Sequence, residues 1–211
     1  MSEPLVTTTQ DESLLWLTLN RPDKRNPLSS DMIAALSTAL QTGYEDTATR
    51  VIIINSAGVA FSAGHDLAET QQRADEPFDE WQQRLKALLS ACADMMGGII
   101  HAPKPVIASV QGIASAAGCQ LVSACDLALA ADTATFCTPG VKIGTFCTTP
   151  LVGIGRNLSR KHALEMALTG DQFTAATAER LRKSNSALFG ACNSKLSACK
   201  QRERFRPTIP L

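Results

Sequence analysis

Several common features of proteins are missing from this 211-residue chain, and each absence excludes a class. No apolar run is long enough to span a bilayer, so no membrane span is expected. The first residues, MSEPLVTTTQDESLLW, contain acids and no basic-then-apolar order, so neither a signal peptide nor a transit peptide is expected. The seven cysteines have no metal-binding or redox spacing. This odd, scattered set predicts reduced thiols in a cytoplasmic protein without a metal site.

The chain also has no net charge at pH 7, because 20 Lys and Arg residues balance 20 Asp and Glu residues. Residues 1–180 hold 13 basic and 19 acidic groups, which is −6, whereas residues 181–211 hold seven basic groups and one acid, which is +6. We therefore divide the chain into a core of residues 1–180 and a basic tail of residues 181–211.

The tail, which has no sustained hydrophobic period, has two interpretations. It is either a frameshifted, alternatively spliced or disordered end, or a genuine segment that binds an anionic partner. A nucleic-acid-binding tail would show salt-dependent affinity. Neither nucleic acid nor a membrane is an expected partner of the protein.

The central stretch of the chain changes its hydrophobic period at a glycine. Residues 106–110 (VIASV) predict a buried strand, which ends at Gln111-Gly112. The small residues 114–118 then lead into apolar positions at helical spacing. The first N–H groups of a helix lack partners within it and favour negative charge. Ala117 and Gly118 therefore predict a helix start with room for a ligand.

A second stretch has the same character. Residues 51–55 (VIIIN) predict a buried strand, and the small residues of FSAGHDL (61–67) follow it. One exposed N–H from each stretch could converge on a single oxygen and hold it as it becomes an oxyanion. Composition alone does not pair the two stretches.

The remaining patterns predict strands that alternate with helices in one α/β domain. Ser29 or Ser30 is expected to cap a helix, and residues 68–77 are expected to form a polar, mobile loop. The other expected elements are strands over 13–20 and 126–131, helices over 78–100 and 159–168, and a glycine- and threonine-rich loop over 136–149.

Four segments resemble the motifs of the crotonase (enoyl-CoA hydratase/isomerase) superfamily: LTLNRPDKRNPLS, FSAGHDL, KPVIASVQGIASAAGCQLVSACDLALAAD and ATFCTPGVKIG. The resemblance covers about residues 14–179, and AAGCQLV is closest to the branch typified by enoyl-CoA hydratase domain-containing protein 3. It implies a crotonase-like ββα spiral whose C-terminal trimerisation helices are truncated or replaced. It also implies an acyl-CoA substrate, no separate cofactor, and a homotrimer or a dimer of trimers.

The resemblance also implies roles for individual residues. The thioester oxygen would lie between the backbone N–H groups of His65 and Ala117. The two glutamates that hold water in hydratases fall at Gln120 and Gly140, and the acid of dienoyl isomerases falls near Thr148. A glutamine cannot accept a proton at neutral pH. Because a positioned acid or base contributes about 10²–10⁴-fold, ordinary hydration is expected to be slow.

Other residues have both a functional and a structural interpretation. Lys24 and Arg25 match a region that contacts coenzyme A in the family, but solvated surface charge explains them equally well. Asp66 either caps a turn or lies with Ala63 and Leu67 along the cofactor. Gly140, Cys147 and Thr148 are expected to line the substrate pocket, although packing is an alternative role for the last two. The His65 imidazole is expected to form a pocket wall rather than a base.

Three hypotheses for function follow. The first is an enoyl-CoA hydratase/isomerase-family enzyme that stabilises an enolate, and the second is a non-catalytic acyl-CoA binder or degenerate family member. The third is a malonyl-type CoA decarboxylase, whose leaving carboxylate supplies the electrons. The tyrosine that the decarboxylase branch carries in its later loop is absent, since that loop has Phe146, Cys147 and Thr148.

Overall fold

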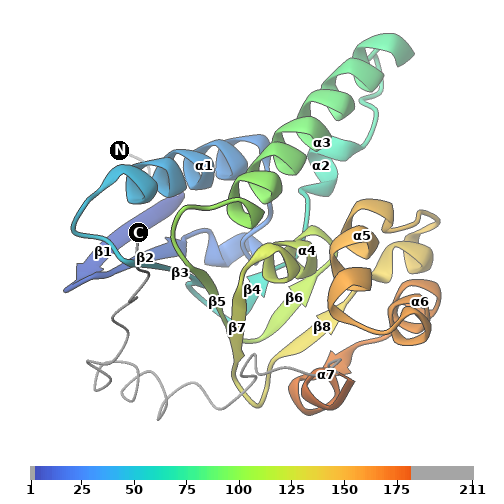
Figure 1. Ribbon diagram of the computed structural model, residues 1–211. Coiled ribbons are helices and arrows are strands. Elements are labelled where there is room, and N and C mark those ends of the chain that lie inside the picture. The colour runs from blue at the N-terminus through green and yellow to red at the C-terminus, as the bar shows by residue number, and fades with distance from the viewer. Residues whose placement is uncertain (1–2, 182–211) are drawn as a thin grey trace.

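The computed structural model describes residues 3–181, which fold around two β-sheets (Figure 1). The larger sheet has the order β1-β2-β3-β5-β7 and the smaller one the order β4-β6-β8-β9. The pairs β1–β2 and β8–β9 are antiparallel and the other pairs are parallel. The strands are β1 (Val6–Asp11), β2 (Leu14–Leu19), β3 (Val51–Ser56), β4 (Ala60–Ser62), β5 (Val106–Val110), β6 (Ile113–Ser115), β7 (Leu127–Ala130), β8 (Thr135–Cys137) and β9 (Phe173–Thr174).

The chain passes repeatedly from the larger sheet to the smaller one. The consecutive pairs β3–β4, β5–β6 and β7–β8 each place their first strand in the larger sheet and their second in the smaller sheet. Helices separate the first two pairs from the strands that follow, as a ββα spiral requires. The predicted mixed α/β fold is therefore confirmed.

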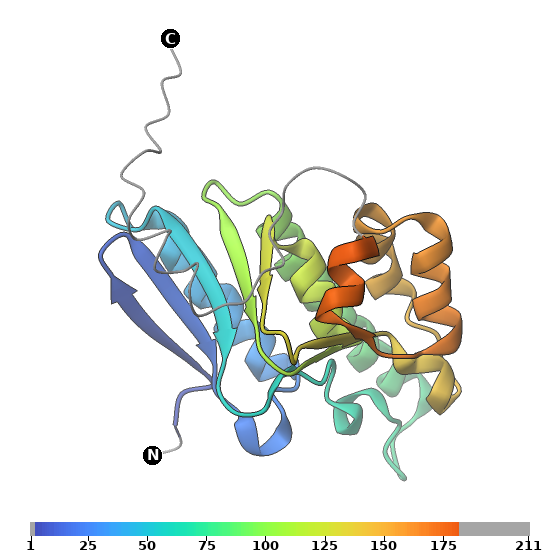
Figure 2. The ribbon, with the colours of Figure 1, turned by 90° about the horizontal axis from the view of Figure 1, so that it is seen from below.

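Helices cover the sheets and continue beyond the smaller one. Helix α1 packs against β1 and β2, and α3 packs against α1 and α4. Figure 2 shows β1 to β3 on one side of the molecule and α5 to α7 on the other. The helices are α1 (Ser30–Glu45), α2 (Leu67–Thr70), α3 (Phe78–Ile100), α4 (Ala117–Ala124), α5 (Thr148–Asn157), α6 (Arg160–Thr169) and α7 (Ala175–Leu181), with 3-10 turns η1 (Pro22–Lys24) and η2 (Pro139–Ile143). Within residues 3–181, none of the helices is both long and apolar enough to cross a membrane.

Most of the predicted elements are present, and two loops need correction. Ser29 caps α1, since its side chain accepts a hydrogen bond from the Met32 N–H at 3.2 Å. The expected loop over 136–149 instead contains the end of β8, η2 and the start of α5. The expected loop over 68–77 includes most of α2. Leu181 is the last described residue, so the rest of the predicted basic tail (181–211) lies outside the described residues.

One ion pair holds the segment before α3 against that helix. The Glu76 carboxylate accepts hydrogen bonds from Nε and Nη2 of Arg84, both at 2.7 Å. Arg84 also donates to the carbonyl oxygens of Glu69 and Gln71. The hydrogen bonds that the Glu76 carboxylate accepts from Arg84 lower the pKa of Glu76 from 4.5 to about 2. The segment is therefore tied to α3 at neutral pH.

We expect the stabilisation from Glu76 to depend on pH. Because its pKa is lower in the folded state, its contribution is present above pH 4.5 and is lost as the pH falls toward 2. Glu76→Gln should lower the thermal midpoint at pH 7, and the difference from the parent protein should shrink between pH 4.5 and 2. Glu80→Gln, at an exposed position on α3, is the control. An equal loss at every pH would contradict this account.

Candidate functional site

Two segments leave the smaller sheet side by side. Strand β4 pairs with β6 in parallel, with Ser62 opposite Ala114. His65 and Ala117 each lie three residues after this pair, just beyond the ends of the two strands. Neighbouring strands lie about 4.8 Å apart. The register therefore brings the two amides to the same end of the smaller sheet.

Two glycines allow these segments to approach closely. A Cβ on Gly118 would lie 2.6 Å from the carbonyl oxygen of Ser62. A Cβ on Gly64 would lie 3.3 Å from the amide nitrogen of Ala117. Gly64 also has a φ of +95°, which L-residues with side chains rarely adopt. A side chain at either position would push the two segments apart.

The turn before α4 has an unusual backbone conformation. Ala116 has a φ of 48° and a ψ of −117°, and such conformations cost about 1–3 kcal/mol and cluster at functional sites. The Ala116 N–H donates to the carbonyl oxygen of Cys137 at 2.9 Å, which fixes the turn against β8. Within residues 3–181, neither the His65 N–H nor the Ala117 N–H donates to a backbone carbonyl. Both amides are therefore available to a ligand.

A third segment supports the one that carries His65. The Ala63 N–H donates to the Arg25 carbonyl oxygen at 2.9 Å, and the Leu28 N–H donates to the Gly64 carbonyl oxygen at 2.7 Å. Lys24 and Arg25 are exposed on this segment. The structure thus places the Arg25 backbone beside FSAGHDL, and contact of Lys24 and Arg25 with coenzyme A stays a prediction.

A buried asparagine fixes the supporting segment. Asn26 is 0% exposed, and its Oδ1 accepts a hydrogen bond from the Arg21 N–H at 2.7 Å. Its Nδ2 donates to the carbonyl oxygens of Ala57 and Ala60 at 2.8 and 2.9 Å. One side chain therefore joins the turn after β2 to the entry of β4. The sequence analysis did not single out this residue.

Two polar atoms at the site have no hydrogen-bond partner among the described residues: Nε2 of His65 and Oε1 of Gln120, both buried. Burial lowers the pKa of His65, while the Glu69 carboxylate opposes this shift, so the imidazole is neutral at pH 7. Gln120 follows Ala117 by three residues on α4. Buried polar groups without partners are rare in native proteins and need an explanation. A bound ligand or water could supply hydrogen-bond partners for both atoms.

The other predicted residues of FSAGHDL have simpler surroundings. Asp66 is the N-cap of α2, and its Oδ1 accepts a hydrogen bond from the Ala68 N–H at 3.0 Å. The capping role is therefore confirmed. Ala63 is exposed, and the Leu67 side chain is 52% exposed. Both are accessible to a ligand, and contact with one stays a prediction.

Position 140 has no room for a side chain in this conformation. A Cβ on Gly140 would lie 2.9 Å from Sγ of Cys147 and 3.2 Å from its amide nitrogen. Cys147 is half-buried at the N-cap of α5, and Thr148 is the exposed first residue of that helix. The Cys147 thiol therefore occupies the space into which a side chain at position 140 would project.

Cys119, Cys137 and Cys147 form a thiol cluster that the sequence analysis missed. Burial raises the pKa of Cys119 to about 12, and the thiols of Cys137 and Cys147 act on it in the same direction. All three residues are free cysteines. In the part of the chain that the structure describes, no group of three or more His, Cys, Asp or Glu is placed to hold a metal ion.

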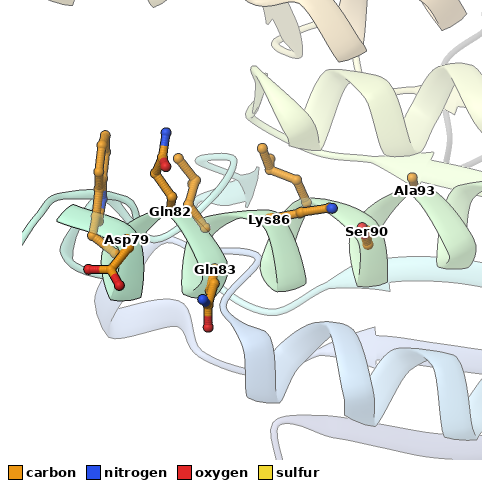
Figure 3. Close-up of a pocket in the computed structure, with 9 residues that line it drawn as sticks. Asp79, Gln82, Gln83, Lys86, Ser90 and Ala93 are labelled. Atoms are coloured by element: carbon orange, nitrogen blue, oxygen red, sulfur yellow. The ribbon is translucent and has the colours of Figure 1, made fainter. Parts of the chain in front are cut away.

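A separate groove of about 680 Å³ runs along one face of α3 (Figure 3). All of its lining residues come from that helix, among them Trp81, Leu85 and Leu89. Neither His65 nor any residue of α4 lines it. The groove is therefore distinct from the two amides.

Comparison with known sequences gives a family for this arrangement. Residues 9–181 match the family described as Enoyl-CoA hydratase/isomerase. Enoyl-CoA hydratase domain-containing protein 3, mitochondrial, of Danio rerio is 42% identical over 179 residues, which cover 84% of this chain and 59% of that protein. The Homo sapiens protein of the same name is 39% identical, over 84% of this chain and 57% of its own length. The predicted family and branch are therefore confirmed.

Solved structures agree with the sequence comparison. The crystal structure of human enoyl Coenzyme A hydratase domain-containing protein 3 superposes with a TM-score of 0.83 at 35% identity, covering 94% of this chain and 75% of that one. An enoyl-CoA hydratase from Mycobacterium smegmatis gives a TM-score of 0.81 at 41% identity, covering 94% and 74%.

The comparisons also limit and correct the earlier expectations. The chain spans less than two thirds of the length of these curated relatives, 59% and 57% in the two cases above. The predicted cytoplasmic location is wrong, because the names of those relatives place them in mitochondria. That prediction rested on unclustered cysteines, which favour a reducing compartment but do not identify which one.

Proposed function

Because the chain belongs to the enoyl-CoA hydratase/isomerase family, we propose that it binds an acyl-CoA thioester between the amides of His65 and Ala117. These amides would hold the thioester oxygen as the bound acyl group becomes an enolate. Coenzyme A enters as part of this substrate, and no metal or separate cofactor is proposed. Like the relatives named above, the protein would act in mitochondria.

The observation that carries this proposal is the pairing of two unpartnered amides. The Ser62–Ala114 register and the glycines at 64 and 118 set the approach of the two segments. Preorganised N–H donors stabilise a developing oxyanion by about 3–4 kcal/mol each. This stabilisation comes from the main chain, so it does not depend on the side chains at these positions.

The side chains around the amides favour slow hydration. Gln120 offers a neutral amide and Gly140 offers no side chain, at the positions where the family resemblance expects two glutamates. The unpartnered Oε1 of Gln120 can accept a hydrogen bond from a water but cannot take its proton at neutral pH. A non-catalytic acyl-CoA binder is therefore the second candidate function, and the same two residues favour it.

Residues around the two amides would contact the rest of the acyl-CoA. Lys24 and Arg25 would face the phosphates or adenine of coenzyme A, with Ala63, Asp66 and Leu67 along its path. Gly140, Cys147 and Thr148 would face the acyl group. We further propose that the protein assembles as a homotrimer, or as a dimer of trimers.

Calorimetry and turnover measurements together test the proposal. We expect crotonyl-CoA to bind more tightly than free coenzyme A, because only the thioester has an oxygen for the two amides. Binding without turnover would select the non-catalytic function. Equal affinity for both ligands, or no binding, would contradict the assignment of the amides.

Gln120→Glu should raise the rate of crotonyl-CoA hydration. The new carboxylate would supply one positioned base, for which about 10²-fold is the lower expectation. Gln82→Glu, on the separate groove of α3, is the matched control and should leave the rate unchanged. An unchanged rate in Gln120→Glu, with thioester binding intact, would show that position 120 does not face the reacting carbons.

A further inference from the structure

The peptide unit that carries the His65 N–H is held from its other side. The Gly64 carbonyl oxygen, which belongs to the same peptide unit, accepts a hydrogen bond from the Leu28 N–H at 2.7 Å. In a trans peptide unit the C=O and the N–H point in opposite directions, so this hydrogen bond directs the His65 N–H away from Leu28. Leu28 also forms a parallel β-bridge with His65. The position of residue 28 therefore sets the direction of one of the two amides.

The other amide is supported within its own helix. The Ala116 carbonyl oxygen shares a peptide unit with the Ala117 N–H, and it accepts a hydrogen bond from the Gln120 N–H at 3.0 Å. This is the ordinary hydrogen bond between residues four apart in an α-helix. The direction of the Ala117 N–H is thus set by α4 itself, whereas the direction of the His65 N–H depends on a segment that is distant in the sequence.

The Glu69 side chain joins the segment that follows His65 to the start of α1. Its Oε2 accepts hydrogen bonds from the Ser30 N–H at 2.8 Å and from the Ser30 hydroxyl at 2.7 Å. Ser30 is the first residue of α1, where an N–H has no partner within the helix and a carboxylate is favoured by the helix dipole. Ser30 lies only two residues after Leu28. The two segments are therefore joined on both sides of His65.

Helix α3 holds the backbone of α2, the four-residue helix that contains Glu69. Arg84 donates hydrogen bonds to the carbonyl oxygens of Glu69 and Gln71, the second at 2.9 Å. The Trp81 Nε1 donates to the Thr70 carbonyl oxygen at 3.0 Å. The backbone of Glu69 is thus anchored to α3 while its side chain reaches α1. Because the base of this side chain is fixed, it loses less conformational freedom when it binds Ser30.

We propose that Glu69 is a positioning residue for the oxyanion donor at His65. Its carboxylate holds α2 against the start of α1, so that the Leu28 N–H keeps the His65 N–H directed at the thioester oxygen. This inference rests on the proposed function, since the direction of the amide matters only if an acyl oxygen binds there. Glu69 exchanges no proton with the substrate in this role. One oxygen of its carboxylate is sufficient, because Oε2 accepts both hydrogen bonds.

Calorimetry of the full chain with acetoacetyl-CoA and with free coenzyme A tests this role. Because free coenzyme A has no acyl oxygen, the ratio of the two affinities measures how well the His65 amide is placed. We expect Glu69→Ala to lower this ratio by about 10-fold, which is less than the loss of about 10²-fold expected when a whole donor is removed. Asp31→Ala, which removes an exposed acid from the same first turn of α1, is the matched control and should leave the ratio unchanged.

Two further variants separate the hydrogen bonds of Glu69 from a general structural effect. Glutamine retains an oxygen that can accept both hydrogen bonds from Ser30, so Glu69→Gln should recover most of the ratio that Glu69→Ala loses. Ser30→Ala removes only the hydroxyl donor and should cause a smaller loss. Added to Glu69→Ala, it should cause no further loss, because the carboxylate that the hydroxyl contacts is already gone.

An unchanged ratio in Glu69→Ala would overturn the inference. A loss in Glu69→Gln as large as the loss in Glu69→Ala would also overturn it, because the hydrogen-bond acceptor would then have no effect. Equal weakening of both ligands in Glu69→Ala would count against it as well, since this result indicates general damage to α2. If the parent protein binds acetoacetyl-CoA no more tightly than free coenzyme A, the proposed function itself fails, and this is seen before any variant is measured.

Discussion

Gly118→Ala should weaken binding of acetoacetyl-CoA by about 10²-fold, the loss expected when one oxyanion donor is misplaced. The added methyl group would lie 2.6 Å from the Ser62 carbonyl oxygen and 2.7 Å from the Ser62 Cβ. Because both atoms belong to a buried residue of β4, the first turn of α4 must move instead. That movement carries the Ala117 amide away from the His65 amide, so the enolate of this ligand loses a donor.

Two controls isolate this effect from general damage. Affinity for free coenzyme A, which has no acyl oxygen, should be unchanged in Gly118→Ala. Gly98→Ala on α3, where an added Cβ meets no atom within 4 Å, should keep full affinity for both ligands. It should also gain about 0.5–1 kcal/mol of stability, as expected for alanine in a helix interior. Equal weakening of both ligands in Gly118→Ala would point to misfolding rather than to the amide.

Asn26→Asp should reduce the free energy of unfolding at pH 8 by about 3 kcal/mol or more, since two hydrogen bonds from a buried donor are lost. The substitution keeps the shape of the side chain at position 26 and the oxygen that accepts a hydrogen bond from the Arg21 N–H. It replaces the donor to Ala57 and Ala60 by an oxygen that faces both carbonyl oxygens. A buried, unpaired carboxylate adds a further cost.

The loss should depend on pH with a defined sign. Burial and the facing carbonyl oxygens raise the folded-state pKa of the new carboxyl group. The variant should therefore be less destabilised at pH 5, where the protonated group can donate one hydrogen bond, than at pH 8. Asn20→Asp, whose parent side chain donates to Pro4 at the surface, serves as the control in urea titrations. A small, pH-independent loss in Asn26→Asp would mean that water reaches this position.

Local sequence patterns predicted the longer elements because each buries a face of its own. The β-branched run of residues 51–55 predicted β3, and apolar residues at helical spacing predicted α3 with its observed bounds. Strands β4 and β6 have three residues each and β9 has two. These strands are defined by their pairing with neighbouring strands. Two or three residues are too few to show an alternating hydrophobic pattern in the sequence.

Helix α5 and the thiol cluster were missed for a different reason. Glycines at 153 and 155 lower the helix propensity of residues 148–157, and tertiary packing overrides it. An added Cβ on Gly153 would meet the Ser123 side chain, so glycine there serves the contact between α5 and α4. The contact between Cys147 and Gly140 likewise depends on how η2 turns back toward α5. The family resemblance supplied the pairing of His65 with Ala117, which composition could not.

The Ser62–Ala114 register has a consequence for how such a protein can change during evolution. The approach of the His65 and Ala117 segments begins at the pairing of β4 with β6, and neighbouring strands lie about 4.8 Å apart whatever their side chains are. Residues 120, 140 and 147 are attached to this scaffold without building it. Exchange of an acid for an amide at position 120 can therefore change the side chains around the two amides while the main-chain arrangement persists.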